Sequence, residues 1–280
     1  MYVLYKSYLS GFPLRVFSWC IALLILTTNS VVLKTLKALK PTFLNLLIGI
    51  DCSIGICFAP VHVMVATNIL PPGFCTLKSI IPFSLSLMNG LIPVGIVFYR
   101  VILVCCATRV MTAPQRKDLE CKILVIMLGV SILLTISTLY HMDHSNEYLR
   151  CMGESRVDPG GHNLPFLHPH HLAISIAFVS RTVFVPVGYL LIFLFRVKNA
   201  NEAPGISDSS RKKRRIQNAV NAKYNFYIWL SEMSIFLMFV YRNPITIRIF
   251  LGISFGLSPV LYLIGMEETR SELRSFAKLF

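Results

Sequence analysis

Charged side chains are scarce in this chain. Asp, Glu, Lys and Arg make up 14% of its 280 residues, whereas a soluble domain carries roughly 25%. Hydrophobic residues make up 55%, and the mean hydropathy is +0.65, so an ordinary soluble domain is excluded. Apolar runs recur that are near the roughly 20 residues needed to cross a bilayer. The composition therefore predicts a polytopic helical membrane protein.

Acidic residues are the scarcer charge: 13 Asp and Glu stand against 27 Lys and Arg, for a net charge of +14. Such an excess can indicate nucleic-acid binding, but the positions of the basic residues fit a membrane topology better. Helical-length apolar segments predict seven spans, at about 14–36, 42–66, 78–105, 122–141, 172–196, 220–241 and 245–265.

The basic residues follow the positive-inside rule. With the N-terminus extracellular and the C-terminus cytoplasmic, 18 of the 27 fall on inner segments and five on outer ones. We therefore expect a multi-pass protein of the plasma membrane, embedded in the lipid bilayer, with no nucleic-acid partner. The inner loop 197–217 contains five consecutive bases, Arg211 to Arg215, which favour anionic lipid headgroups or a partner protein.

The chain shows no internal repeat, so residues 1–280 are predicted to form one domain, an all-α seven-transmembrane helix bundle. After the last span, residues 266–280 repeat apolar residues at spacings near three and four, with basic residues between them. This pattern predicts a short amphipathic helix in the inner interface rather than a disordered tail.

Catalytic motifs are also lacking. The spans contain no Gly-x-Ser-x-Gly with a partner histidine and no His-Glu-x-x-His, so we do not expect an enzyme. Neither inverted repeats nor paired broken helices are visible, which disfavours a transporter or channel, although this stays the alternative function. Six histidines crowd the outer side between residues 141 and 171, but no spacing defines a metal site, and a solvated loop is favoured over a metal site or a proton sensor.

Most of the eight cysteines fall within predicted spans, where a small hydrophobic residue is sufficient explanation. Cys75 and Cys151 differ, because both are placed on the outer side of the membrane. An oxidising compartment makes a disulfide between them more plausible than two free thiols.

Ionisable residues within the spans are costly and often functional. Arg100 stands in the apolar stretch GIVFYRVILVCC, either in a functional role or as an arginine that snorkels to the interface. Asp51 lies deep in the second span, where a carboxyl group is protonated or paired. Glu232 pairs with Arg248 or Arg181, or these three residues contact a ligand in the outer half of the bundle.

Several residues in chain order resemble the rhodopsin-like (class A) G-protein-coupled receptors. Asn29 resembles the asparagine of the first helix, and Asp51 ends LLIGID in the second. Cys75 and Arg100 are separated by 25 residues, as are the disulfide cysteine and motif arginine of that family. Pro186 matches the proline of the fifth helix, and SPVLY matches the end of the seventh through Ser258, Pro259 and Tyr262.

The resemblance implies a receptor that binds an extracellular ligand and activates a heterotrimeric G protein. Arg100 would contact the G protein, while Tyr99 replaces the acid that restrains this arginine in the family, so basal activity is expected. Trp229 stands near the place of the family's toggle tryptophan, although the surrounding motif is absent. A sodium ion near Asp51 is also implied, with oxygen ligands from Asn89, Ser254 and Ser258; the alternative is a neutral, hydrogen-bonded aspartic acid.

Overall fold

A computed structural model describes residues 12–66, 75–105, 111–143, 169–201, 216–217, 220–221, 223–233, 249, 252–265 and 267–277. Within these residues the regular elements are helices and no strand is found. Five helices are long and apolar enough to cross a bilayer. The chain is therefore a helical membrane protein. The predicted total of seven spans stays a prediction, because the sixth and seventh are described only in part, mainly over 223–233 and 252–265.

The five long helices lie close to the predicted spans. They are α2 (Phe12–Ala38), α3 (Phe43–Ala66), α4 (Cys75–Cys105), α5 (Ala113–Asp143) and α7 (Pro169–Asn201). α5 begins well before the predicted position 122, because residues 113–121 are mostly good helix formers that continue the helix beyond its apolar part. In lipid these segments form helices because each backbone group must find its hydrogen-bond partner within the segment.

The last described elements are short. A π-helix, η2 (Gly252–Leu257), leads directly into α10 (Ser258–Gly265), and α11 (Glu267–Ala277) follows. Pro259 is the second residue of α10, and because η2 runs directly into this helix, its missing N–H leaves the carbonyl oxygen of Phe255, four residues earlier, without its α-helical donor. The wide π turn before it brings the Ser254 and Ser258 side chains into the interior, where both are buried.

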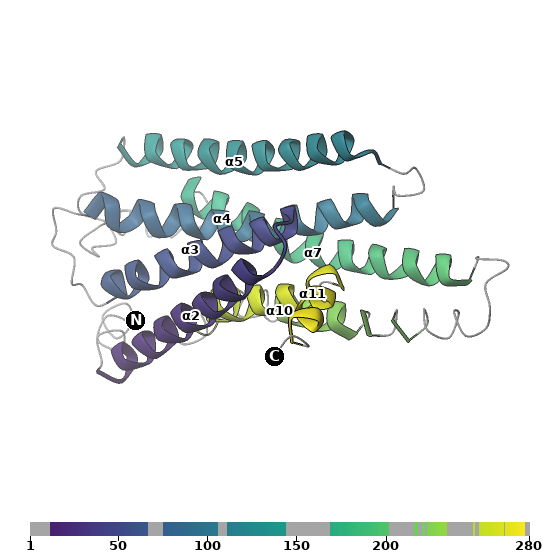
Figure 1. Ribbon diagram of the computed structural model, residues 1–280. Coiled ribbons are helices and arrows are strands. Elements are labelled where there is room, and N and C mark those ends of the chain that lie inside the picture. The colour runs from purple at the N-terminus through teal and green to yellow at the C-terminus, as the bar shows by residue number, and fades with distance from the viewer. Residues whose placement is uncertain are drawn as a thin grey trace.

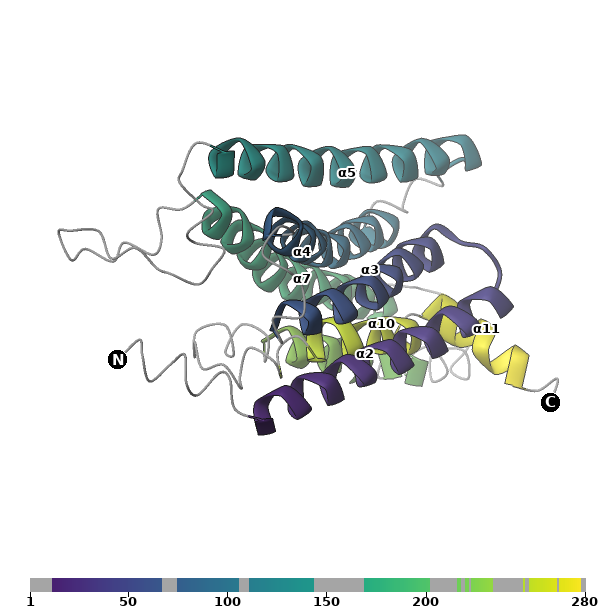
Figure 2. The same cartoon turned by 90° about the vertical axis from the view of Figure 1, so that its left-hand side faces the viewer.

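α4 occupies the middle of the bundle, and α3, α5 and α7 pack against it. Figures 1 and 2 show α5 along one edge and α2 at the opposite edge in both views. Only 11% of the most apolar stretch of α5 is buried, against 56% for α3 and for α4. α5 therefore presents most of its surface to lipid, and the buried interior of the bundle lies between the other helices.

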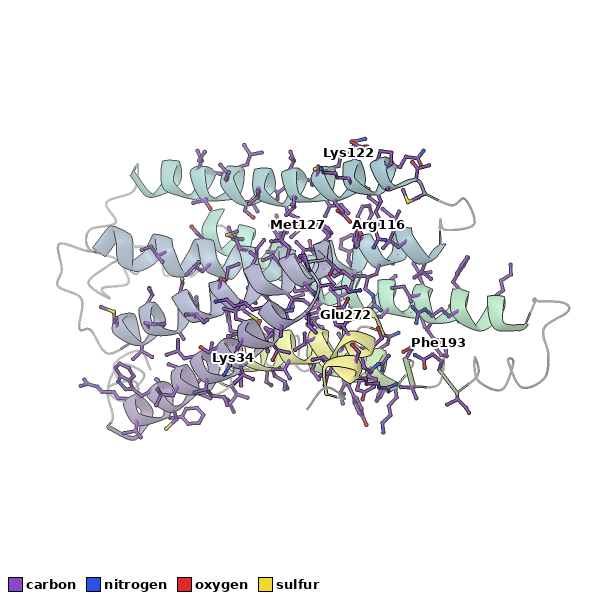
Figure 3. The ribbon with its side chains drawn as sticks, in the orientation of Figure 1. Lys34, Arg116, Lys122, Met127, Phe193 and Glu272 are labelled. Carbon is purple, nitrogen blue, oxygen red and sulfur yellow. The ribbon has the colours of Figure 1, made fainter. Side chains whose placement is uncertain are left out.

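α5 is held to α4 at a glycine. A side chain at Gly95 would collide with the sulfur atom of Met127, which lies between the two helices in Figure 3. The absence of a Cβ atom at Gly95 thus lets the thioether of α5 reach the surface of α4.

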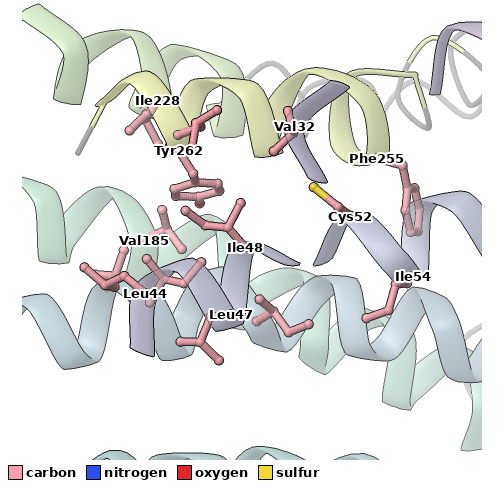
Figure 4. Packing of buried hydrophobic residues seen from close by; sticks show 14 of the residues in the cluster. Val32, Leu44, Leu47, Ile48, Cys52, Ile54, Val185, Ile228, Phe255 and Tyr262 are labelled. Atoms are coloured by element: carbon pink, nitrogen blue, oxygen red, sulfur yellow. The ribbon is translucent and has the colours of Figure 1, made fainter. Parts of the chain in front are cut away.

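The apolar core lies between α2, α3, α4, α7, segment 223–233 and α10. Figure 4 shows the ring of Tyr262 among Ile48, Val185 and Ile228 from three different helices. Farther along the bundle, the rings of Phe58 and Phe255 stack with centroids 4.2 Å apart. These contacts fix η2 and α10 against α3, and so position the polar residues that η2 and α10 carry.

Asn29 ties α2 to η2. Its amide nitrogen donates to the carbonyl oxygen of Phe255 at 2.7 Å and to that of Ile25 at 2.9 Å. A Cβ atom at Gly55 of α3 would lie 2.6 Å from the same nitrogen, so the glycine provides the space that this bond needs.

α11 confirms a helix within 266–280, and its Leu273 packs against the core. Arg270, however, is buried rather than facing outward. Its guanidinium donates to Asn221 and lies 4.5 Å over the ring of Tyr224. Through Arg270, the polar side of α11 thus contacts Asn221 and Tyr224, at the start of the sixth predicted span.

Candidate functional site

The most extensive polar contacts in the described interior surround Arg181 of α7. Its side chain is fully buried, and all three guanidinium nitrogens donate hydrogen bonds. Nε and Nη2 bind the two carboxylate oxygens of Glu232, with Nη2 to Oε1 at 2.6 Å. This parallel pairing is the geometry in which arginine binds a carboxylate most strongly.

The other donors of Arg181 bind oxygens from three further elements. Nη1 donates to Asn89 Oδ1 of α4 at 2.8 Å and to Ser254 Oγ of η2 at 2.9 Å. Nη2 donates to Ser258 Oγ of α10 at 3.0 Å. We call Arg181, Glu232, Asn89, Ser254 and Ser258 the Arg181 cluster. It connects α4, α7, segment 223–233, η2 and α10 through a single guanidinium group.

The positive charge of Arg181 is balanced within the cluster by the negative charge of Glu232. Glu232 is 0% exposed, as is Arg181, so neither charge is solvated and each depends on the other. The hydroxyl of Tyr262 adds a longer contact of 3.4 Å to Glu232 Oε1. Removing one partner of such a buried pair costs about 3–5 kcal/mol, because the other charge is left uncompensated. The cluster therefore constrains how α7 and segment 223–233 sit relative to each other.

Asp51 of α3 lies at the edge of the cluster. Asn89 Nδ2 donates to Asp51 Oδ1 at 2.9 Å, while Asp51 Oδ2 is buried with no hydrogen-bond partner among the described residues. Asn89 therefore links Asp51 to the buried ion pair: its oxygen accepts from Arg181 and its nitrogen donates to Asp51.

The four residues expected around a sodium ion do gather in one place, but they do not fit that ion as they are arranged. Asn89 Oδ1, Ser254 Oγ and Ser258 Oγ already accept hydrogen bonds from Arg181. Ser254 Oγ also donates to Asn89 Oδ1 at 2.6 Å. Asp51 Oδ2 alone is left as a buried oxygen without a partner. The cation among these oxygens is a guanidinium group of the chain itself.

A second site lies toward the C-terminal end of α4, where Arg100 is 3% exposed. Its guanidinium carbon lies 5.5 Å from the centre of the Tyr189 ring of α7, a cation–π distance. Its Nη1 has no hydrogen-bond partner among the described residues. No described acidic residue forms an ion pair with Arg100, which agrees with the absence of an acid before it in the sequence.

Tyr99 is engaged by α5 instead. Its hydroxyl donates to Glu120 Oε1 at 2.7 Å and accepts from Arg116 Nε at 2.9 Å. Sequence reasoning missed these two partners, although Arg116 and Glu120 are four residues apart and form an ion pair on one helix face. Tyr99 thus holds the start of α5.

The remaining sequence-predicted residues lie elsewhere. Pro186 and Trp229 line a groove between α7 and segment 223–233, and the Trp229 ring stacks on Phe226 at 5.7 Å, so neither belongs to the Arg181 cluster. Arg248, Cys151 and the side chain of Cys75 lie outside the described residues, as do the side chains of the outer histidines, so the disulfide stays a prediction. The observed Arg181–Glu232 pair is one of the two pairings that the sequence left open.

The fold and the buried cluster define a class: a helical membrane protein with an ion-paired polar interior. A scan against protein-family models finds no match to the chain, and a search of curated proteins finds none either.

Proposed function

We propose that the chain is a seven-transmembrane receptor of the plasma membrane that binds an extracellular ligand and activates a heterotrimeric G protein. The observation that carries this proposal is Arg100, a buried arginine toward one end of the central helix with an N–H group that has no partner among the described residues. A buried donor without an acceptor is costly. A partner that offers a backbone carbonyl at this end would remove that cost.

The Arg181 cluster supports the same proposal from the middle of the bundle. Segment 223–233 belongs to the sixth predicted span, which in a receptor moves away from the others on activation. Here Glu232 of that segment is held by Arg181 of α7. A ligand that binds the outer half of the bundle would act by changing the geometry of this pair, and the inner ends of the helices would then separate around Arg100.

The test is G-protein recruitment in cells, measured with a panel of tagged Gα subunits at equal surface expression. We expect the native chain to recruit one Gα class and Arg100→Ala to lose that recruitment. Lys122→Ala is the matched control, because Lys122 is a basic residue of α5 whose side chain is 67% exposed and whose ion pair with Asp118 contributes little.

Recruitment that persists in Arg100→Ala would contradict the role of Arg100. Solute flux through proteoliposomes that contain the chain and no G protein would favour the transporter alternative instead. The two readouts are independent, so each outcome separates one class of function from the other.

A further inference from the structure

The groove between α7 and segment 223–233 has a volume of about 550 Å³, within the usual range of small-molecule sites, about 300–1,000 Å³. We call it the α7 groove; it is lined by Pro186, Val187, Tyr189, Leu190, Phe193, Asn225, Phe226 and Trp229. Leu190 is 56% exposed and Phe226 54% exposed. Because Val179–Arg196 is a membrane span, this apolar surface faces lipid.

One lining residue is polar and incompletely satisfied. Asn225 is 6% exposed, and its Oδ1 is buried with no hydrogen-bond partner among the described residues. An amide oxygen withdrawn from water without a donor is unfavourable. The groove therefore combines a long apolar wall with a buried amide oxygen that has no donor among the described residues.

The acceptor lies near one membrane interface. Lys223 is exposed and precedes Asn225 by two residues, about 3 Å along a helix. On α7, Arg196 follows Phe193 by three residues, about 4.5 Å. Such basic residues reach toward the headgroups. From Asn225 and Phe193 the groove runs toward Trp229 and Pro186, that is, toward the middle of the bilayer.

We propose that the α7 groove binds a membrane sterol, whose hydroxyl group donates to Asn225 Oδ1 and whose rigid apolar body lies along Trp229 and Leu190. A sterol has one uncharged donor at its interfacial end and a flat ring system for the stacked Phe226 and Trp229 side chains, whose planes meet at 26°. A phosphate headgroup offers acceptors, which Asn225 Oδ1 cannot bind.

A sequence pattern on the same segment agrees with this ligand. Lys223, Tyr227 and Leu230 have the basic, aromatic and aliphatic order proposed for cholesterol contact, a pattern of little specificity by itself. Here the Lys223 ammonium lies 5.8 Å over the Tyr227 ring. The sterol site depends on the membrane spans alone and holds whether or not the chain couples to a G protein.

The test uses the full chain in phosphatidylcholine nanodiscs with a diazirine-bearing cholesterol, followed by mass spectrometry of the labelled peptides. We expect labelling to concentrate on residues 186–193 and 225–229. Unlabelled cholesterol should compete, and its 3-O-methyl ether should compete about fivefold less well, since it lacks the donor of one hydrogen bond.

Asn225→Leu removes the acceptor at similar volume and should reduce labelling by a similar factor. Leu133→Ala, at a 68% exposed leucine of α5, is the control and should leave labelling unchanged. Labelling spread over α5 and α7 alike would overturn the proposal. So would equal competition by the methyl ether on the native chain, a measurement that needs no variant to fold.

Discussion

Two of the buried arginines in the described part of the chain, Arg181 and Arg100, lie in regions of opposite character. Around Arg181 every guanidinium nitrogen has an acceptor, and a carboxylate balances the charge. Around Arg100 the described residues offer an aromatic face, and Nη1 has no acceptor. The first arrangement holds helices together, whereas the second leaves a donor available to a partner. Burial alone therefore does not distinguish a structural arginine from one that serves recognition.

The largest expected effect is a difference in stability between variants of the two arginines. Arg181→Met should lower the free energy of unfolding by about 3–5 kcal/mol, because Glu232 is left as an unpaired buried charge. Arg100→Met should change it by less than about 1 kcal/mol, because methionine replaces an incompletely satisfied group with an apolar one. Both values come from denaturant titration in detergent micelles. Equal losses in the two variants would remove the distinction between the regions.

A smaller effect is expected at the buried asparagines. Asn89→Leu should cost about 2–3 kcal/mol, because it takes an acceptor from Arg181 and a donor from Asp51. Asn225→Leu is the matched variant, since the oxygen of Asn225 has no partner in the part of the chain that the structure describes, and in sterol-free micelles it should be close to neutral. An Asn225→Leu variant as unstable as Asn89→Leu would mean that Asn225 has a structural role within the bundle.

For the smallest effect, we expect sodium ions to cause no specific stabilisation of the native chain. The native chain should have the same thermal unfolding temperature in sodium and potassium chloride, because Arg181 already binds the oxygens that sodium would need. Arg181→Met combined with Glu232→Met frees Asn89, Ser254 and Ser258 and should become sodium-stabilised, by an amount that grows with sodium concentration. Sodium-specific stabilisation of the native chain that Asp51→Asn abolishes would show that an ion binds beside the guanidinium.

The helices that cross the membrane follow from the sequence, because an apolar run of sufficient length in lipid has few alternatives to a helix. The residues at which the helices begin and end are predicted less accurately. α5 extends to Ala113 because polar helix formers continue the helix past its apolar part. Hydropathy identifies the residues that lie in the membrane, and it does not show where the helix itself begins. The burial of Arg270 was likewise missed, since periodicity shows that a helix is amphipathic but not which neighbour its polar side meets.

The composition of the site was easier to predict than its contacts. Asp51, Asn89, Ser254 and Ser258 could be brought together by resemblance, and Arg181 and Glu232 could be recognised as costly charges within spans. That the guanidinium stands among the same oxygens depends on the rotation of α7 about its axis. Hydropathy does not specify that rotation, since Val183 and Val187, which face outward, are as apolar as Val185, which is buried.

The most direct measurement is a double-mutant cycle between Arg181 and Glu232. Unfolding free energies are compared for the native chain, Arg181→Met, Glu232→Met and the double variant. If the buried pair organises the interior, the double variant is more stable than either single variant, and the coupling energy exceeds about 2 kcal/mol. Losses that add to within about 0.5 kcal/mol would show that the two side chains act independently and would contradict the account.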